Sequence, residues 1–205
     1  MTNLPLASGP PPGRSKIVLA AVIFEGGLAA VALAGGWLTG RPLLAEVRLD
    51  LRDALVGLAA TLPLVAALLV VVRVRWRPLR RLVALIEEVV VPLFESCRPL
   101  DLALIAAVAG VGEELLFRGL VQGWLDARWG TPAALLVASL LFGAAHAVTW
   151  TYAVYATLVG IYLGWLWLAS GNLLVPVIVH AGYDFFALVY LVRRERPQEK
   201  SQLGD

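Results

Sequence analysis

The chain has 205 residues, of which 60% are hydrophobic and 16% are charged, and its formal net charge at pH 7 is +2. An average soluble chain has about 45–50% apolar and about 25% charged residues, so a soluble fold of this size would have too little polar surface to cover its core. The small net charge gives no support for a nucleic-acid partner. The single cysteine, Cys97, excludes an intrachain disulfide and a Cys-rich metal site. We therefore expect an integral membrane protein.

Six stretches of the chain are long and apolar enough to predict transmembrane helices. A bilayer core needs about 20 apolar residues of helix, and an open strand would leave its backbone groups unsatisfied in lipid. The expected fold is all-α, a polytopic transmembrane helix bundle with about six spans. A seventh stretch, 82–96, is short, carries Glu87 and Glu88, and predicts one interfacial or re-entrant helix. The six expected spans are 17–38, 54–72, 99–121, 131–148, 150–169 and 173–192.

Four regions are expected along the chain. Residues 1–15 contain four prolines and predict a disordered N-terminal tail. Residues 16–96 are expected to hold the N-terminal transmembrane helices and a basic loop, and residues 97–192 a second helix bundle, which contains the candidate site residues considered below. Residues 193–205 predict a charged C-terminal tail.

The positive charges predict how the chain is oriented in the bilayer. Five arginines lie between Arg73 and Arg81, and three arginines and a lysine follow Val192. Such clusters beside apolar spans favour the cytoplasmic side. Six spans put both clusters and both termini in the cytoplasm, and the composition suggests a bacterial inner (cytoplasmic) membrane. If 82–96 crossed the bilayer instead, the last four spans would be inverted and the C-terminal charges would violate this preference.

Apart from Asp101 at the edge of one span, six charged or imidazole side chains fall within the last four expected spans, where each is costly and needs a reason. Both histidines of the chain are among them, and the same carboxylates and imidazoles are typical of catalytic sites. Small residues surround these groups and predict close helix packing there. The six side chains are Glu113, Glu114, Arg118, His146, His180 and Asp184.

The spacing of these residues predicts which of them face one another. Glu114 and Arg118 are four residues apart, so they share one helix face and favour an ion pair. Glu113 is rotated by about 100° from its neighbour, so one acid can pair with Arg118 while the other faces a cavity. His180 and Asp184 are also four apart, which lets the carboxylate orient the imidazole ring.

The expected span ends leave one inconsistency in depth. At about 1.5 Å per residue, Glu113 and His180 lie at similar depth, and His146 lies about 12 Å lower. The three side chains meet only if the fourth span starts later than Thr131, or if its helix is tilted or broken.

Three motifs resemble the CPBP family, which contains CAAX-prenyl-protein endopeptidases, bacteriocin-processing enzymes and Abi proteins. In order along the chain they match E-E-x-x-x-R, F-x-x-x-H and H-x-x-x-N, with Asp184 in place of the more usual Asn. The resemblance covers residues from about 100 to 190. The matching residues are Glu113, Glu114 and Arg118, then Phe142 and His146, then His180 and Asp184.

The resemblance implies an intramembrane endopeptidase that hydrolyses a peptide bond in a membrane-associated or exported protein or peptide. It implies that Glu113 and His146 activate water, that Glu114 and Arg118 form a supporting pair, and that His180 and Asp184 stabilise the oxyanion. An ionised carboxylate cannot donate a hydrogen bond to an oxyanion, so Asp184 must be protonated, act through His180, or belong to a site that holds a metal.

Two versions of the mechanism remain open. Without a metal, Glu113 is a general base and no cofactor is needed. With one, Glu113, His146 and His180 would bind a divalent, zinc-like ion that lowers the pKa of its bound water. A transporter or ion-binding membrane protein would use the same buried groups, and a non-catalytic membrane scaffold would keep them without needing them.

Four further residues have two interpretations each. Glu25, in the first span, is expected to be a partner for a polar group on another helix, with a substrate-channel or proton-handling role as the alternative. Trp150, Tyr152 and Tyr155 follow His146 closely; they are expected in an aromatic belt at the membrane interface, with a substrate groove as the alternative.

Overall fold

The computed structural model describes residues 13–194, and within this range all the regular elements are helices. Most of the predicted tails, at 1–15 and 193–205, lies outside the described residues. The elements are α1 (Arg14–Leu38), the 3-10 turn η1 (Leu43–Glu46), α2 (Leu51–Val71), α3 (Arg77–Leu85), the π-helical η2 (Ile86–Val90), α4 (Val91–Phe94), α5 (Pro99–Glu114), the π-helical η3 (Leu115–Gln122), α6 (Gly123–Trp129), α7 (Thr131–Ala145), α8 (Trp150–Ser170) and α9 (Leu174–Arg194).

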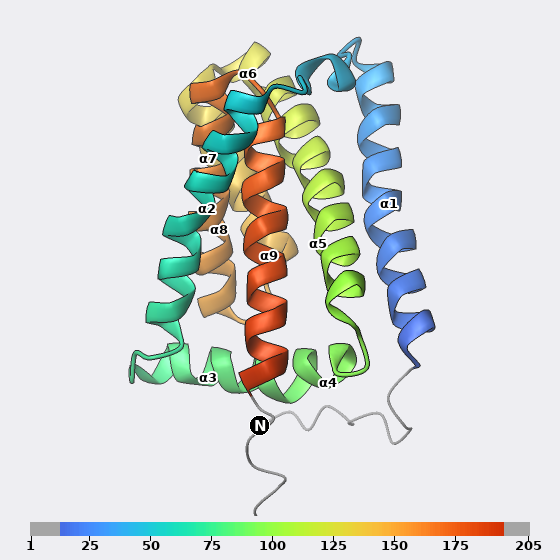
Figure 1. The fold of residues 1–205 in the computed structure, drawn as a ribbon. Helices are drawn as coiled ribbons and strands as arrows, with labels where there is room; N and C mark the ends of the chain where they lie inside the picture. The colour runs from blue at the N-terminus through green and yellow to red at the C-terminus, as the bar shows by residue number, and fades with distance from the viewer. Residues whose placement is uncertain (1–12, 195–205) are drawn as a thin grey trace, which may run out of the picture.

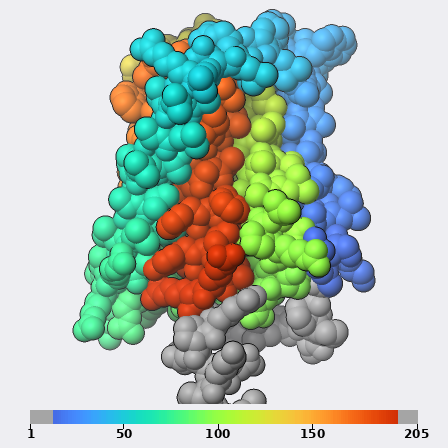
Figure 2. Space-filling model, viewed as in Figure 1, coloured from blue at the N-terminus to red at the C-terminus, as the bar shows by residue number. Residues whose placement is uncertain are grey.

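The long helices form an elongated bundle. Helices α2, α9, α5 and α1 stand side by side in that order (Figure 1), and together they make one continuous face in the space-filling view (Figure 2). Helices α7 and α8 pack against each other behind this row; both contact η3, and α8 also contacts α9. The second half of the chain therefore supplies the centre of the bundle.

Four helices, α1, α2, α8 and α9, are long and apolar enough to cross a membrane. Helix α1 illustrates why lipid must cover them. It buries only Ala32 and Gly36, and it exposes large apolar side chains, including Leu19, Ile23 and Phe24. Exposing such a surface to water would be very unfavourable, so the chain is an integral membrane protein.

The third and fourth expected spans have different lengths from those predicted. The chain is helical without a break from Pro99 to Trp129, through α5, η3 and α6, and this run extends eight residues beyond the predicted 99–121. Helix α7 begins at Thr131, as expected, but ends at Ala145 and not at 148. Its 15 residues measure about 22 Å, which is less than the bilayer core of about 30 Å. These two corrections remove the inconsistency in depth, because the end of α7 lies beside Glu113.

The predicted interfacial helix lies across one end of the bundle. It runs from Arg77 to Phe94 through α3, η2 and α4, roughly perpendicular to the long helices (Figure 1). It begins five residues before the expected 82–96, inside the predicted basic loop, with Pro78 in its first turn. The start of α1 and the end of α9 lie at this same end of the molecule.

Small residues let the helices approach closely around the ionisable side chains, as predicted. A Cβ atom at Gly110 would lie 2.9 Å from the backbone nitrogen of Ala181, so only glycine permits this contact between α5 and α9. A Cβ at Gly112 would clash with the backbone carbonyl of Glu25, and one at Gly143 would clash with α8. The Gly112 contact brings α1 against α5 one residue before Glu113.

Candidate active site

The centre of the bundle holds a buried cluster of charged side chains. Glu114 is fully buried, and its Oε1 atom accepts hydrogen bonds from Arg118 Nη1 and from His180 Nδ1, both at 2.8 Å. One carboxylate thus ties the end of α5 to η3 and to α9. Charge-assisted hydrogen bonds of this kind compensate for removing the charges from solvent.

Arg118 extends this cluster to two more helices. Its Nη2 donates to the backbone carbonyl of Gly160 on α8 at 3.0 Å, and its guanidinium carbon lies 4.6 Å from the ring centroid of Phe142 on α7. Arg118 belongs to η3, whose wide π-helical turns follow directly after Glu114. Such segments are rare and occur often at functional sites.

The neighbouring acid, Glu113, faces the second imidazole. His146 Nδ1 lies 2.8 Å from the carbonyl oxygen of Phe142, and it must be the donor because a carbonyl only accepts. In the neutral ring this leaves Nε2 as the acceptor, and Nε2 lies 3.7 Å from Glu113 Oε2. That carboxylate oxygen is buried and has no hydrogen-bond partner. The two groups therefore converge as unoccupied proton acceptors.

The last carboxylate, Asp184, lies on the other side of His180. Its Oδ2 is 3.4 Å from His180 Nε2, so the two ring nitrogens of this histidine face two different carboxylates. Asp184 is more exposed than the rest of the cluster, with 31% of its side chain accessible. The structure thus brings all six predicted site residues together, and the imidazoles divide between the acids: His146 with Glu113, and His180 with Glu114 and Asp184.

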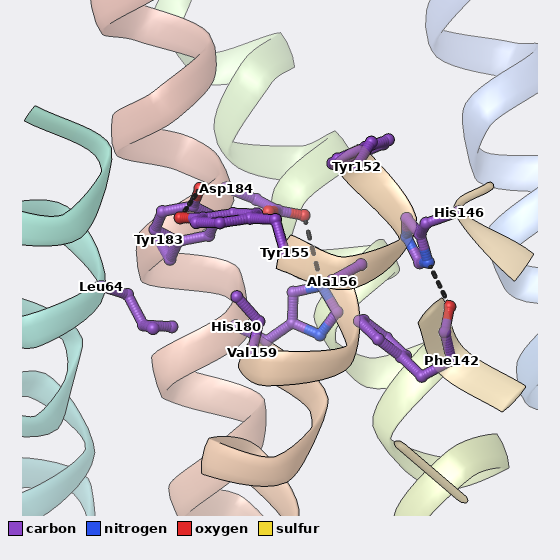
Figure 3. Close-up of a pocket in the computed structure, with 10 residues that line it drawn as sticks. All are labelled: Leu64, Phe142, His146, Tyr152, Tyr155, Ala156, Val159, His180, Tyr183 and Asp184. Carbon is purple, nitrogen blue, oxygen red and sulfur yellow. Dashed lines mark hydrogen bonds and ion pairs between the residues drawn. The ribbon is translucent and has the colours of Figure 1, made fainter. Parts of the chain in front are cut away.

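A small cavity of about 80 Å³ opens beside these groups (Figure 3). Its polar wall combines the two histidines and Asp184 with tyrosine hydroxyls, and its apolar wall comes from α2, α7 and α8. The lining residues are Leu64, Phe142, His146, Tyr152, Tyr155, Ala156, Val159, His180, Tyr183 and Asp184.

A larger cavity of about 360 Å³ leads from the site towards the helix that lies across the end of the bundle. Its walls are mostly apolar, including Leu82, Ile86 and Phe94 of α3, η2 and α4. Glu113 and Asp184 line the same cavity. The arrangement is that of an apolar space with a polar end.

The side chains do not fit the predicted set of metal ligands. Among residues 13–194, no three His, Cys, Asp or Glu side chains converge on a point where they could hold one ion. In particular, both nitrogens of His180 are directed at carboxylates, so this ring cannot join Glu113 and His146 as a ligand without turning away.

Sequence reasoning undervalued two residues of the site. Glu25 was expected to pair with a polar group on another helix. Instead its Oε2 is buried without a hydrogen-bond partner, and its side chain lines the large cavity together with Glu113. Tyr183 was not identified at all, although it lies three residues after His180 and therefore on the same helix face.

The three aromatic residues after His146 divide between the two interpretations. Tyr152 and Tyr155 line both cavities, which supports the substrate groove. Trp150 is 84% exposed and lines neither of them, as expected of a residue at the membrane interface.

Comparison with known proteins agrees with this geometry. The family model described as type II CAAX prenyl endopeptidase Rce1-like matches residues 96–186. These residues form an Rce1-like domain. This confirms the predicted resemblance, and the domain contains all six predicted site residues. The chain matched no curated protein and no solved structure at the threshold applied.

The Rce1-like domain does not build the cavities alone. Glu25 of α1, Leu64 of α2 and Leu82 of α3 precede the matched segment, and each lines one of the cavities. The residues before the domain therefore contribute to the walls of the candidate site and not only to its support.

Proposed function

We propose that the chain is an intramembrane endopeptidase that hydrolyses a peptide bond in a membrane-associated or exported protein or peptide. The observation that carries this proposal is the convergence of Glu113, which lines the large cavity, with His146, which lines the small one: Glu113 Oε2 and His146 Nε2 lie 3.7 Å apart. Both atoms are free to accept a proton, whereas Glu114 already accepts hydrogen bonds from Arg118 and His180 at its Oε1.

In the proposed reaction, Glu113 and His146 take a proton from water as its oxygen attacks the carbonyl carbon of the substrate. The electron pair of the C=O bond moves onto oxygen, and the resulting oxyanion lies beside His180 and Asp184. When the C–N bond breaks, the proton passes to the leaving nitrogen. Asp184 acts through His180, because its ionised carboxylate cannot donate a hydrogen bond. This sequence needs no metal, in agreement with the poor convergence of the predicted ligands.

The large cavity supports a substrate with an apolar group next to the cleaved bond. Its walls are apolar over most of their length, and its ionisable groups are Glu25, Glu113 and Asp184 together with three tyrosines. A lipid chain or a run of apolar side chains would gain hydrophobic burial there. A prenylated CAAX peptide satisfies this requirement, and the description of the matching family names a CAAX prenyl endopeptidase; a farnesylated peptide is one substrate of this type.

This substrate assignment is tested with two internally quenched peptides of identical sequence, each ending in a CAAX motif, one of them farnesylated. We expect the purified protein in liposomes to cleave the farnesylated peptide with the higher kcat/KM. A chelator should leave the rate unchanged. Equal rates on the two peptides would contradict the apolar assignment. If the chelator inactivates the protein and added zinc restores its activity, the metal-free mechanism is wrong.

We also propose six spans with both termini in the cytoplasm of a bacterial cell, counting the run from Pro99 to Trp129 and helix α7 as spans. The basic residues of α3 and the end of α9 lie at one end of the bundle, which supports this orientation. In a Cys97→Ser background, an impermeant maleimide should label Leu49→Cys in spheroplasts, because Leu49 is exposed at the opposite end. Arg75→Cys should react only after lysis. The reverse pattern would contradict the orientation.

A further inference from the structure

Hydrolysis of a peptide bond places negative charge on the carbonyl oxygen, and N–H or O–H donors must stabilise it. The charged cluster offers few of them. Asp184 has no proton to donate when it is ionised. The two nitrogens of His180 are directed at Glu114 and at Asp184, so a hydrogen bond from this ring to the oxyanion would compete with a carboxylate.

Two tyrosines on the wall of the small cavity supply the missing type of group. The hydroxyl oxygens of Tyr155 on α8 and Tyr183 on α9 lie 2.9 Å apart, which is a hydrogen bond. Both side chains line the cavity together with His146, His180 and Asp184, and Figure 3 shows the pair next to Asp184. Each hydroxyl carries one proton. Whichever tyrosine donates to the other, the O–H of the second one remains available to a ligand.

We propose that Tyr155 and Tyr183 are catalytic residues whose free O–H donates a hydrogen bond to the oxyanion. This inference rests on the proposed peptidase function. The free tyrosine O–H is the hydrogen-bond donor that an ionised Asp184 cannot provide. This role also explains why two hydroxyls meet at a cavity next to a carboxylate. The proton of the tyrosine stays on its oxygen throughout. The protons that move are those of water, which Glu113 and His146 take and return to the leaving nitrogen.

The pairing also predicts an unusual mutational pattern. If Tyr155 is replaced by phenylalanine, Tyr183 keeps its hydroxyl and can turn its O–H towards the oxyanion, and the converse holds for Tyr183→Phe. We therefore expect each single variant to lose less than about tenfold in kcat, and the double variant to lose about 100- to 1,000-fold, as is usual when an oxyanion donor is removed. KM should change by less than about threefold, because the hydrogen bond forms only in the transition state.

The experiment measures kcat, KM and melting temperature for wild type, both single variants and the double variant, with the farnesylated peptide. Tyr162→Phe is the matched control, because its hydroxyl donates to the carbonyl of Ala60 and lines neither cavity. A double variant with kcat close to wild type would overturn the inference. So would a loss of kcat accompanied by an equal loss of folded protein, which would assign the pair a purely structural role between α8 and α9.

Asp184→Asn provides a second test. If the two tyrosines had only a structural role, this change would not restore kcat. The asparagine amide can donate where the carboxylate cannot, so this change in the Tyr155→Phe/Tyr183→Phe background should recover at least about tenfold in kcat. Failure to recover would mean that the tyrosines do not act as donors. Glu113→Gln separates the two proposals. If it is inactive while the tyrosine double variant is fully active, only this inference fails; if it is as active as wild type, the proposed function itself fails.

Discussion

Replacement of Glu113 by glutamine is expected to lower kcat by at least about 1,000-fold, because the amide keeps the shape of the side chain but cannot accept a proton from water. The fold should survive the change. Glu113 Oε2 has no hydrogen-bond partner, so the substitution breaks no hydrogen bond at that atom. The measurement is steady-state cleavage of the farnesylated peptide, with the apparent melting temperature of each preparation determined in the same detergent.

Glu88→Gln is the matched control for this experiment. It is the same chemical change at an exposed position of η2, outside both cavities, and it should alter kcat by no more than about twofold. An active, correctly folded Glu113→Gln variant would show that another group activates the water. A transporter or a scaffold that keeps these side chains would show no cleavage in any variant, wild type included.

The apolar spans of α1, α2, α8 and α9 could be predicted from the sequence because their signal is local. Each is a run of about 20 apolar residues between polar or turn-forming segments, and the bilayer imposes that length on each run separately. Helix α9, for example, was expected at 173–192 and spans Leu174–Arg194. Such boundaries depend little on the rest of the fold.

The end of α7 could not be predicted from hydropathy, because the sequence stays mostly apolar beyond Ala145, with only His146 and Thr149 interrupting it before α8. The helix ends where Thr149 starts the next one: its side chain accepts a hydrogen bond from the backbone N–H of Tyr152 and caps α8. A threonine at this place was an available signal for a helix start. The sequence did not show that the chain reverses here and leaves His146 beside Glu113, because that contact depends on the tertiary structure.

The site was predictable within each helix and not between helices. Spacing by four residues correctly paired Glu114 with Arg118. It gave no information on which imidazole faces which acid, because that depends on how α5, α7 and α9 pack against one another. Glu25 shows the same limit, since it reaches the cavity through the close contact of its backbone with Gly112, 87 positions further along the chain.

Replacement of Arg118 by leucine should lower the free energy of unfolding by about 3–5 kcal/mol, because it leaves the charge of a fully buried carboxylate without its cation. The side chain of Arg118 is 1% exposed and that of Glu114 is 0% exposed, so water cannot replace the lost hydrogen bond. The substitution also removes the bond to the Gly160 carbonyl and the contact with Phe142. The apparent melting temperature and a titration with denaturing detergent measure the loss.

Two further variants separate the buried charge from the volume of the side chain. Arg14→Leu removes an arginine from the partly exposed pair with Asp101 at the end of the bundle, and it should leave the melting temperature almost unchanged. Glu114→Gln combined with Arg118→Leu should be more stable than Arg118→Leu alone, because the amide carries no charge that needs a partner. If the double variant is instead as unstable as the sum of the two single changes, packing of the arginine and not its charge stabilises the centre of the bundle. The proposed separation of roles, in which Glu114 holds the site together and Glu113 performs the chemistry, requires the first result.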